Sequence, residues 1–363
     1  MTALGARIRR RIRLGGPITL AQYMAEALAN PADGYYGGEA GGAVIGARGD
    51  FVTAPEISQM FGELIGLWCA EMWRRMGAPD PVRLVELGPG RGTLMADALR
   101  AAATVPALRA ALRIHLVETS PRLRARQAET LAGSGADWHD SLADAPDGPL
   151  LLVANEFFDA LPIHQFTATA AGWRERLVGV AGDGRLALCA APGATPALAL
   201  LDRLGVEPVP GAVAELCPAG IALAATIGAR VAAERGAALI IDYGAGGALG
   251  GSVQAVRAHR VVAPLAEPGA ADLSAHVDFA ALARAAREAG AAVHGPVAQG
   301  AFLRALGLEA RAARLARRAT PAQQAALAAA CARLAGDDQM GALYKVLAIA
   351  HPALPTPAGF GEE

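Results

Sequence analysis

The feature that most constrains the fold is a glycine-rich turn that joins an apolar strand to a helix. It has the sequence VELGPGRGTL and spans residues 85–94. The run before it is apolar like a buried strand, and helical spacing resumes at Leu94. Gly88, Gly90 and Gly92 let a ligand approach the backbone and the helix N-terminus closely. The turn therefore predicts an α/β fold with a site for a nucleotide-type ligand.

The spacing within the turn disfavours two common ligands. A dinucleotide fingerprint needs glycine at three positions of GxGxxG, and Thr93 stands at the third. A P-loop ends in Gly-Lys-Ser/Thr, and the only lysine, Lys345, lies far downstream. The remaining E-x-G-x-G-x-G pattern resembles motif I of the class I S-adenosylmethionine methyltransferases, and a glycine turn without a ligand is the alternative. The residues assigned to the cofactor at this turn are Glu86, Gly88, Gly90 and Gly92.

A second apolar strand ends in an acidic residue. Residues 114–117 precede Glu118, and a helix with Pro121 in its first turn follows. A carboxylate at this strand end can accept hydrogen bonds from both hydroxyls of a ribose. We therefore assign Glu118 to the cofactor, and a solvated strand end is the alternative.

Two further carboxylates follow the next predicted strand. Residues 149–154 are apolar and lead into the sequence NEFFD, residues 155–159. Ligands bind beyond the carboxyl ends of parallel strands, so Glu156 and Asp159 should face the same crevice as the glycine turn. Two acids beside two phenylalanines suit a substrate cation, and Asn155 is assigned to the cofactor. The alternative is a helix N-terminal turn whose acids interact with the helix dipole.

Later segments add two candidates. Residues 237–241 predict a fifth strand that ends in Asp242, and His276 precedes a helix that Asp278 can cap. We expect Asp242 and His276 on the substrate side of the crevice, although a lone histidine is more often structural than catalytic. Residues 340–349 predict a last strand that can close a seven-stranded sheet.

The same patterns predict how the chain is divided. A hairpin around Gly182-Asp183-Gly184 lies in a stretch too long for an ordinary crossover, which indicates an insertion. The predicted regions are an N-terminal helical and glycine-loop extension at 1–80, a core at 81–165 and 237–350, an inserted accessory region at 166–236, and a frayed tail at 351–363.

Composition disfavours several other functions. The net charge is −1, and no apolar run is long enough to span a bilayer, so neither nucleic acid binding nor membrane insertion is expected. The four cysteines show no C-x-x-C and the histidines no H-x-x-x-H, so we expect no metal site and no disulfide framework. Scattered cysteines fit a reducing compartment, with the cytoplasm as the default for a bacterial protein. Arg7 to Arg13 is read as the basic face of a first helix rather than a transit peptide remnant.

Several sequence blocks together resemble the MidA-like family, which includes a mitochondrial complex I assembly factor that acts as a protein arginine methyltransferase. The resemblance runs nearly end to end. The blocks that carry it are Gly34-Tyr35-Tyr36, residues 49–58 (GDFVTAPEIS), residues 86–94, residues 156–159 (EFFD), residues 242–244 (DYG) and residues 272–279 (DLSAHVDF).

The resemblance implies a class I methyltransferase fold, which is Rossmann-like, and S-adenosylmethionine as methyl donor. It also implies symmetric dimethylation of an arginine in a core subunit of respiratory complex I, in the mitochondrial matrix if the source is eukaryotic. The carboxylates of Glu156 and Asp159 would then hold and polarise the guanidinium, which stays protonated in water. Two alternatives are an assembly chaperone that binds the cofactor without transferring the methyl group, and a methyltransferase that acts on a small molecule.

Overall fold

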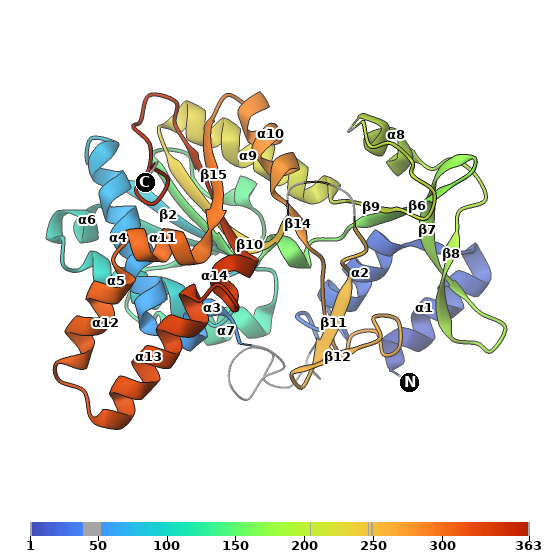
Figure 1. Ribbon diagram of the computed structural model, residues 1–363, viewed down its shortest axis with the longest axis horizontal. Coiled ribbons are helices and arrows are strands. Elements are labelled where there is room, and N and C mark those ends of the chain that lie inside the picture. Colours follow the sequence, from blue (N-terminus) through green and yellow to red (C-terminus); the bar gives the residue numbers. More distant parts are fainter. Residues whose placement is uncertain (1, 39–51, 204, 246, 248–249, 362–363) are drawn as a thin grey trace. The chain divides into compact units, whose positions relative to one another are not determined.

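The computed structural model describes residues 2–38, 52–203, 205–245, 247 and 250–361 (Figure 1). Most of the predicted glycine-rich loop at 34–50, and the start of the GDFVTAPEIS block, lie outside these residues. The chain forms two compact units, each described here by itself. Unit 1 comprises Met1–Phe51, Asp159–Ile221 and Ala245–Ala281, and unit 2 comprises Val52–Phe158, Ala222–Gly244 and Leu282–Glu363.

Unit 2 has a β-sheet with both parallel and antiparallel strands and with helices packed around it, as the predicted α/β fold class requires. Over the described residues of unit 2, seven strands follow the path β15-β16-β10-β5-β2-β3-β4. The strands of this path are β2 (Val82–Leu87), β3 (Leu112–Val117), β4 (Asp137–His139), β5 (Leu150–Asn155), β10 (Ala237–Ala245), β15 (Ala292–Ala298) and β16 (Tyr344–Ala350). From β10 to β4 the neighbouring strands are parallel, whereas β16 runs antiparallel to both β10 and β15.

The central strands carry the predicted apolar runs, so the expectation for these strands is confirmed. Every residue of β5 is buried, as a strand covered on both faces requires. Because β2, β3 and β5 are parallel and adjacent, their carboxyl ends lie at one edge of the sheet. The glycine turn, Glu118 and the NEFFD segment leave the sheet at that edge.

Helices pack around this sheet within unit 2. They are α3 (Ala54–Ile57), α4 (Gln59–Arg75), α5 (Thr93–Ala102), α6 (Pro106–Ala111), α7 (Pro121–Thr130), α11 (Gln299–Ala305), α12 (Leu308–Ala316), α13 (Pro321–Ala335) and α14 (Met340–Leu343). Two further helices, α9 (Pro218–Glu234) and α10 (Phe279–Glu288), have their first residues in unit 1 and the rest in unit 2. Gly228 of α9 lies against the backbone of Ala286 in α10.

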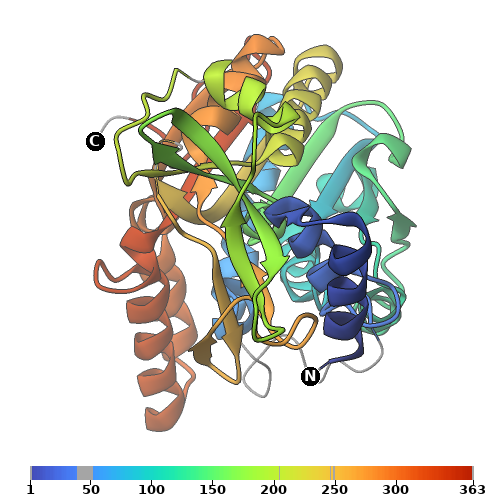
Figure 2. The same cartoon turned by 90° about the vertical axis from the view of Figure 1, so that its right-hand side faces the viewer.

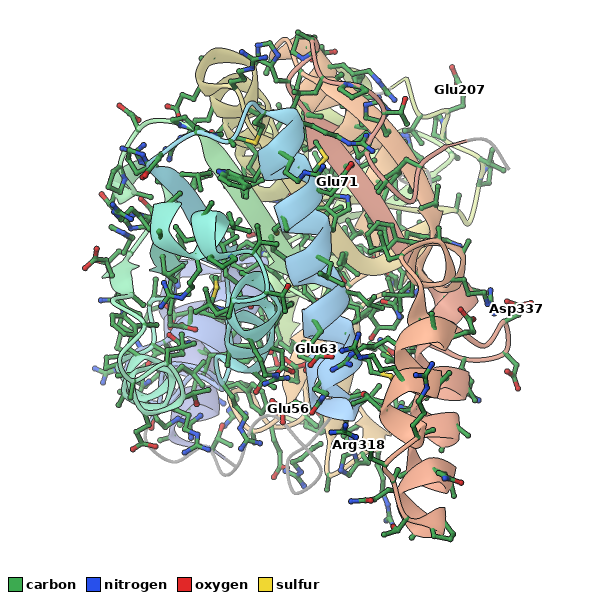
Figure 3. The ribbon with its side chains drawn as sticks, turned by 90° about the vertical axis from the view of Figure 1, so that its left-hand side faces the viewer. Glu56, Glu63, Glu71, Glu207, Arg318 and Asp337 are labelled. Atoms are coloured by element: carbon green, nitrogen blue, oxygen red, sulfur yellow. The ribbon has the colours of Figure 1, made fainter. Side chains whose placement is uncertain are left out.

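Two glycines let α4 and α5 approach closely. Figure 3 shows α4 with Glu63 near the end closer to Glu56 and Glu71 farther along. A Cβ atom on Gly62 would lie 2.6 Å from Asp97 Cβ, and one on Gly66 would lie 2.5 Å from the Ala98 carbonyl oxygen. Gly62 and Gly66 therefore give α4 a smooth face that packs against α5 in the core.

We expect Gly66→Ala to lower the free energy of unfolding by about 1–3 kcal/mol, because the added methyl group meets the rigid backbone of α5. An alanine in a helix otherwise stabilises by up to about 1 kcal/mol relative to glycine. Gly15→Ala is the matched control, since Gly15 ends α1 and its Cβ would meet nothing within 4 Å. Chemical denaturation of both variants measures the difference, and equal stabilities would contradict the packing argument.

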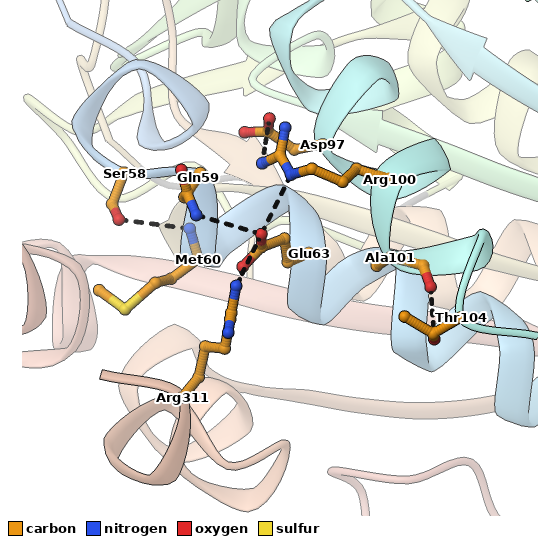
Figure 4. Close-up of polar contacts among 9 residues, drawn as sticks. All are labelled: Ser58, Gln59, Met60, Glu63, Asp97, Arg100, Ala101, Thr104 and Arg311. Carbon is orange, nitrogen blue, oxygen red and sulfur yellow. Dashed lines mark hydrogen bonds and ion pairs between the residues drawn. The ribbon is translucent and has the colours of Figure 1, made fainter. Parts of the chain in front are cut away.

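An ion cluster around the buried carboxylate of Glu63 joins α12 to this helix pair (Figure 4). Glu63 is 5% exposed and accepts from Arg311 Nε at 2.7 Å and Nη2 at 3.0 Å. Arg100 Nε also donates to Glu63 at 3.2 Å, and its Nη2 donates to Asp97 at 2.7 Å. Each buried carboxylate thus has the cationic partners that its burial requires.

Unit 1 contains the N-terminal helices (Figure 2) and two antiparallel sheets, one with the path β1-β7-β6-β9 and β8 beside β7, the other with the order β12-β11-β13. Its elements are α1 (Ala3–Gly15), β1 (Ile18–Thr19), α2 (Leu20–Ala29), β6 (His164–Thr169), β7 (Gly172–Val180), β8 (Leu186–Ala190), α8 (Pro196–Arg203), β9 (Val213–Leu216), β11 (Gln254–Arg257), β12 (Arg260–Val262), β13 (Asp272–Ser274) and β14 (Val277–Asp278). The predicted hairpin is confirmed as β7 paired with β8, and the predicted first helix is α1. Leu4, Ile8 and Ile12 bury one face of α1 in the core of this unit.

The two units divide the chain differently from the predicted regions. The predicted extension at 1–80 includes α4, but the apolar stripe of this helix packs on α5, so it lies in unit 2. Residues 222–236 of the predicted insertion also belong to unit 2, and residues 245–281 of the predicted core belong to unit 1. Within unit 1 this later segment hydrogen-bonds to β9, where Gly250 N donates to the Val213 carbonyl oxygen at 2.8 Å.

Two predictions near the C-terminus are wrong. The last strand does not begin at Met340, because residues 340–343 form α14 against the end of α13, where a Cβ on Gly341 would lie 2.3 Å from the Ala335 carbonyl oxygen. The tail is not frayed over its described residues. Leu354 is 7% exposed, and the Phe360 ring centroid lies 5.5 Å from that of Phe302. The prolines end the strand, but these apolar side chains still pack on unit 2.

Candidate active site

The glycine turn adopts a backbone that only glycine accommodates readily. Gly88, Gly90 and Gly92 have φ values of +60°, +54° and +79°. A Cβ on Gly88 would lie 2.6 Å from Cδ2 of Phe157, so the turn has no room for a side chain there. Gly92 caps the N-terminus of α5. The turn is thus a cradle of bare backbone at a helix N-terminus, as a ligand bound through its main chain requires.

Glu86 places a carboxylate at the base of this turn. It is 3% exposed, and its Oε2 has no hydrogen-bond partner among the described residues. Burial raises the pKa of Glu86 to about 8. A buried carboxylate oxygen without a partner is costly unless a ligand satisfies it. Glu86 therefore suits a cofactor that carries a positive charge.

The raised pKa of Glu86 predicts a pH dependence of stability. The unfolded chain loses this proton near pH 4.5 and the folded protein near pH 8, so the free energy of unfolding falls as pH rises between them. A tenfold difference in proton affinity between the two states corresponds to about 1.4 kcal/mol. In Glu86→Gln this part of the fall should disappear. Denaturation of both proteins across that pH range measures it, and parallel curves would contradict the buried environment of Glu86.

Glu118 lies at the carboxyl end of β3, as predicted. It is 9% exposed, and its carboxylate accepts from the Ser120 backbone N–H at 2.8 Å and from Gln127 Nε2 at 3.2 Å. Burial raises the pKa of Glu118, and these hydrogen bonds act against the increase. The Glu118 backbone N–H donates to the carbonyl oxygen of His139 at 3.0 Å. The carboxylate is thus held in a fixed position at the strand end.

Glu56 contacts the glycine turn, although the sequence pattern did not mark it as a cofactor or substrate residue. It accepts from Thr93 Oγ1 at 2.5 Å and from Arg91 Nη1 at 3.2 Å. Both donors belong to the turn, so Glu56 ties α3 to the turn. The signal that could have located it is its place in the TAPE sequence directly before the α4 stripe.

Glu156 and Asn155 stand where β5 ends. Glu156 has φ +50°, which is uncommon for a residue other than glycine. Its carboxylate accepts from the Ala54 backbone N–H at 2.9 Å, from Asn155 Nδ2 at 3.1 Å and from the Tyr344 hydroxyl at 3.1 Å. Asn155 is 8% exposed, and its Oδ1 has no hydrogen-bond partner in the described part of the chain. Tyr344 and Ala54 are partners that sequence spacing did not reveal.

The helix-dipole alternative for the NEFFD segment does not match the structure. Only a short 3-10 turn, Phe158–Ala160, follows Glu156, and the next element is β6. Pro162 explains this, because a residue before proline is disfavoured in the helical region. The acids of this segment therefore have no α-helix whose dipole they could stabilise.

Asp242 is fully buried and bound to the backbone. Its Oδ2 accepts from the Phe158 N–H at 3.0 Å and its Oδ1 from the Tyr243 N–H at 2.9 Å. These bonds fix the segment that follows β5 and so support a positioning role for Asp242.

Asp159 and His276 lie in unit 1, whereas Glu156 and Asp242 lie in unit 2. The carbonyl oxygen of Asp159 accepts from Ala275 N at 2.9 Å, so Asp159 and the DLSAHVDF segment are brought together. His276 is exposed, and its backbone N–H donates to Ser252 Oγ at 2.8 Å. Asp278 caps α10 as predicted, accepting from Ala281 N at 3.1 Å.

Unit 1 holds a second polar cluster around Asp159. The Tyr36 hydroxyl donates to Asp272 Oδ1 at 2.7 Å. Burial first, then Asp272 and Asp159, raise the pKa of Tyr36 well above its ordinary value. The cluster joins three of the sequence blocks that carry the family resemblance.

Two other kinds of feature are absent from the described residues. These residues contain no group of three or more His, Cys, Asp or Glu side chains that could hold a metal ion. None of the described helices is both long enough and apolar enough to cross a membrane.

Comparisons with known proteins give the site a chemical context. Residues 64–297 match the family model described as "Putative S-adenosyl-L-methionine-dependent methyltransferase". The Drosophila melanogaster "Protein arginine methyltransferase NDUFAF7 homolog, mitochondrial" is 38% identical over 96% of this chain and 84% of its own length. The Mus musculus "Protein arginine methyltransferase NDUFAF7, mitochondrial" is 40% identical over 83% of this chain and 73% of its own.

A solved structure shares the fold. A protein from Burkholderia thailandensis, crystallised with S-adenosyl-homocysteine, superposes with a TM-score of 0.85 and 31% identity over 98% of this chain and 94% of its own. The two relatives are named as mitochondrial proteins, so they do not support the expected cytoplasmic location. The unsatisfied Glu86 oxygen and the bare turn fit a cationic nucleoside cofactor. The chain belongs to this family of S-adenosyl-L-methionine-dependent methyltransferases, with S-adenosylmethionine as its cofactor.

Proposed function

We propose that the protein methylates an arginine side chain of a protein substrate, by symmetric dimethylation of a core subunit of respiratory complex I. Support comes from the two relatives, which are named protein arginine methyltransferases. The observation that carries the proposal is the fixed carboxylate of Glu156, which follows directly after β5 at the sheet edge of the glycine turn. The location would be the cytoplasm in a bacterium and the mitochondrial matrix in a eukaryote.

The cofactor would be held at the edge where β2, β3 and β5 end. S-adenosylmethionine supplies the methyl group from its sulfonium when bound. The residues that would hold it are Glu86, Gly88, Gly90, Gly92, Glu118 and Asn155. Glu118 offers fixed acceptor oxygens for ribose hydroxyls, and Glu86 and the Asn155 Oδ1 offer acceptors that the described protein leaves unused.

Glu156 would hold the substrate arginine. A guanidinium has a pKa above about 12, so its most effective partner is an ionised carboxylate in planar hydrogen-bond geometry. The three donors around Glu156 stabilise the ionised form and fix its orientation. Glu156 would therefore orient the guanidinium and offset its positive charge, and the nitrogen that gains the methyl group would lose one proton to this carboxylate. Phe157 packs beside the turn and would restrict the access of water.

The other predicted substrate residues have separate tasks in this proposal. Asp242 would position the segment that carries Glu156, because it binds the backbone N–H of Phe158. Asp159 and His276 stay predicted substrate residues of unit 1, where the Asp159 carbonyl oxygen accepts from the N–H of Ala275, the residue before His276.

Comparing complex I subunits with and without this gene tests the function. Mass spectrometry of subunits from a deletion strain should show an arginine that has lost two methyl groups. Complementation with the wild-type gene should restore them, whereas Glu156→Gln should not. If Glu156→Gln restores assembly without methylation, the protein acts as a chaperone. If no subunit changes but a small metabolite loses its methyl group, the substrate is a small molecule.

A further inference from the structure

One fully buried side chain contacts both cofactor-binding elements. Gln127 lies on α7 with 0% exposure. This helix is otherwise polar, and its buried residues are Leu123 and Gln127, one turn apart. A buried amide must make hydrogen bonds to offset its lost hydration. The position of Gln127 on the apolar stripe therefore indicates a specific polar task.

The Gln127 amide bridges three elements. Its Nε2 donates to the carbonyl oxygen of Gly90 at 2.8 Å and to Glu118 Oε2 at 3.2 Å. Its Oε1 accepts from Trp138 Nε1 on β4 at 2.8 Å. An indole nitrogen can only donate, so Trp138 fixes which side of the amide faces the two acceptors. The amide thus connects the glycine turn to the acid at the end of β3.

We propose that Gln127 is a positioning residue for the cofactor, which holds the Glu118 carboxylate in register with the glycine turn. This inference rests on the proposed ribose role of Glu118. Without the amide, Gly90 and Glu118 would each lose a buried donor, and the two cofactor contacts would no longer move as one unit. Groups that are already fixed in position bind a ligand with a smaller loss of conformational entropy.

The same contact favours the ionised form of Glu118. Burial raises the pKa of Glu118, and the hydrogen bond from Gln127 lowers it. The backbone N–H groups of Ser120 and Thr119 also donate to this carboxylate and lower its pKa. Arg124 Nε donates to the Glu118 carbonyl oxygen at 2.6 Å, and the His139 carbonyl oxygen accepts from Glu118 N. Arg124 also pairs with Asp140. Loss of the Gln127 donor should therefore raise the pKa of Glu118 further.

The test uses S-adenosyl-homocysteine and calorimetry on the full-length protein. Gln127→Met keeps the length of the side chain and removes its polar atoms. We expect its affinity to fall by about tenfold, which corresponds to about 1.4 kcal/mol, because Glu118 and Gly90 each lose a buried hydrogen-bond donor. As pH is lowered, affinity should be lost at a higher pH than in the wild type, because the carboxylate protonates earlier. Trp138→Phe should lower the affinity and shift its pH dependence in the same directions, but by smaller amounts.

Gln299→Met is the matched control. Gln299 is a second glutamine in unit 2 with 0% exposure, and its Nε2 donates to the Leu334 carbonyl oxygen at 2.8 Å, away from the cofactor residues. Its replacement should lower the melting temperature and leave affinity and its pH profile unchanged. A 2′-deoxyribose analogue of the ligand adds a second readout. The wild type should discriminate against it, and Gln127→Met should discriminate less.

The outcomes separate this inference from the proposed function. Normal affinity and pH profile in folded Gln127→Met would overturn the positioning role, as would equal losses in Gln127→Met and Gln299→Met. If Gln127→Met does not fold, an unchanged affinity and pH profile in Trp138→Phe overturns it instead. A wild type that binds the ligand without discriminating against the 2′-deoxy analogue would refute the ribose role of Glu118, and a wild type that fails to bind at all would refute the cofactor site itself.

Discussion

Glu156→Gln should lower methyl transfer to protein arginine by about tenfold to a hundredfold. The change keeps the size of the side chain but removes the negative charge that would hold the guanidinium. Hydrogen bonds to a charged group are worth about 1.5–3 kcal/mol, and about 1.4 kcal/mol is a factor of ten in rate. Affinity for S-adenosyl-homocysteine should stay near that of the wild type, because Glu156 is assigned to the substrate.

Glu71→Gln is the control for this variant. Glu71 is a partly exposed acid on α4 that pairs with Arg74 and Arg75, and its exchange should leave transfer unchanged. Transfer rate, ligand affinity and melting temperature are measured together for both variants. Normal transfer with a lowered melting temperature in Glu156→Gln would make this acid structural and would return the catalytic question to Glu56 and His276.

Gly88→Ala should weaken binding of S-adenosyl-homocysteine by at least about tenfold. The new Cβ would collide with Phe157 at 2.6 Å and occupy the cradle, and overpacking of this kind costs about 1–3 kcal/mol. Alanine at φ +60° is also strained, which lowers the free energy of unfolding by a further ~1–2 kcal/mol.

Gly133→Ala separates strain from collision. Gly133 has φ +78°, and a Cβ there would meet nothing within 4 Å. It should lose stability from strain alone and bind the ligand normally. Equal affinities of Gly88→Ala and wild type, measured by calorimetry, would show that the ligand does not lie against this turn.

The sequence predicted the parts of the fold that one short pattern determines. Apolar runs located β2, β3, β5 and β10, and the glycine spacing located the turn with its left-handed backbone. Strand ends then placed Glu118 and Glu156 correctly at one edge of the sheet, since parallel neighbours share their direction.

Contacts between distant segments could not be read from such patterns. Tyr344 reaches Glu156 across 188 residues, and Arg311 reaches Glu63 across 248. Local spacing carries no information about such pairs, because they depend on the order of strands in the sheet. For Gln127 the sequence gives part of the answer. Its four-residue spacing from Leu123 and Leu131 indicates that it is buried, but the spacing does not indicate which residues it hydrogen-bonds to.

The measurement that tests the account most directly is transfer of an isotopically labelled methyl group. The purified protein is incubated with S-adenosylmethionine that carries a deuterated methyl group and with complex I subunits from the deletion strain, and the products are sequenced by mass spectrometry. We predict label on the guanidino nitrogens of an arginine, with little label from Glu156→Gln. Label on another residue type, or none from a protein that binds S-adenosyl-homocysteine, would contradict the account.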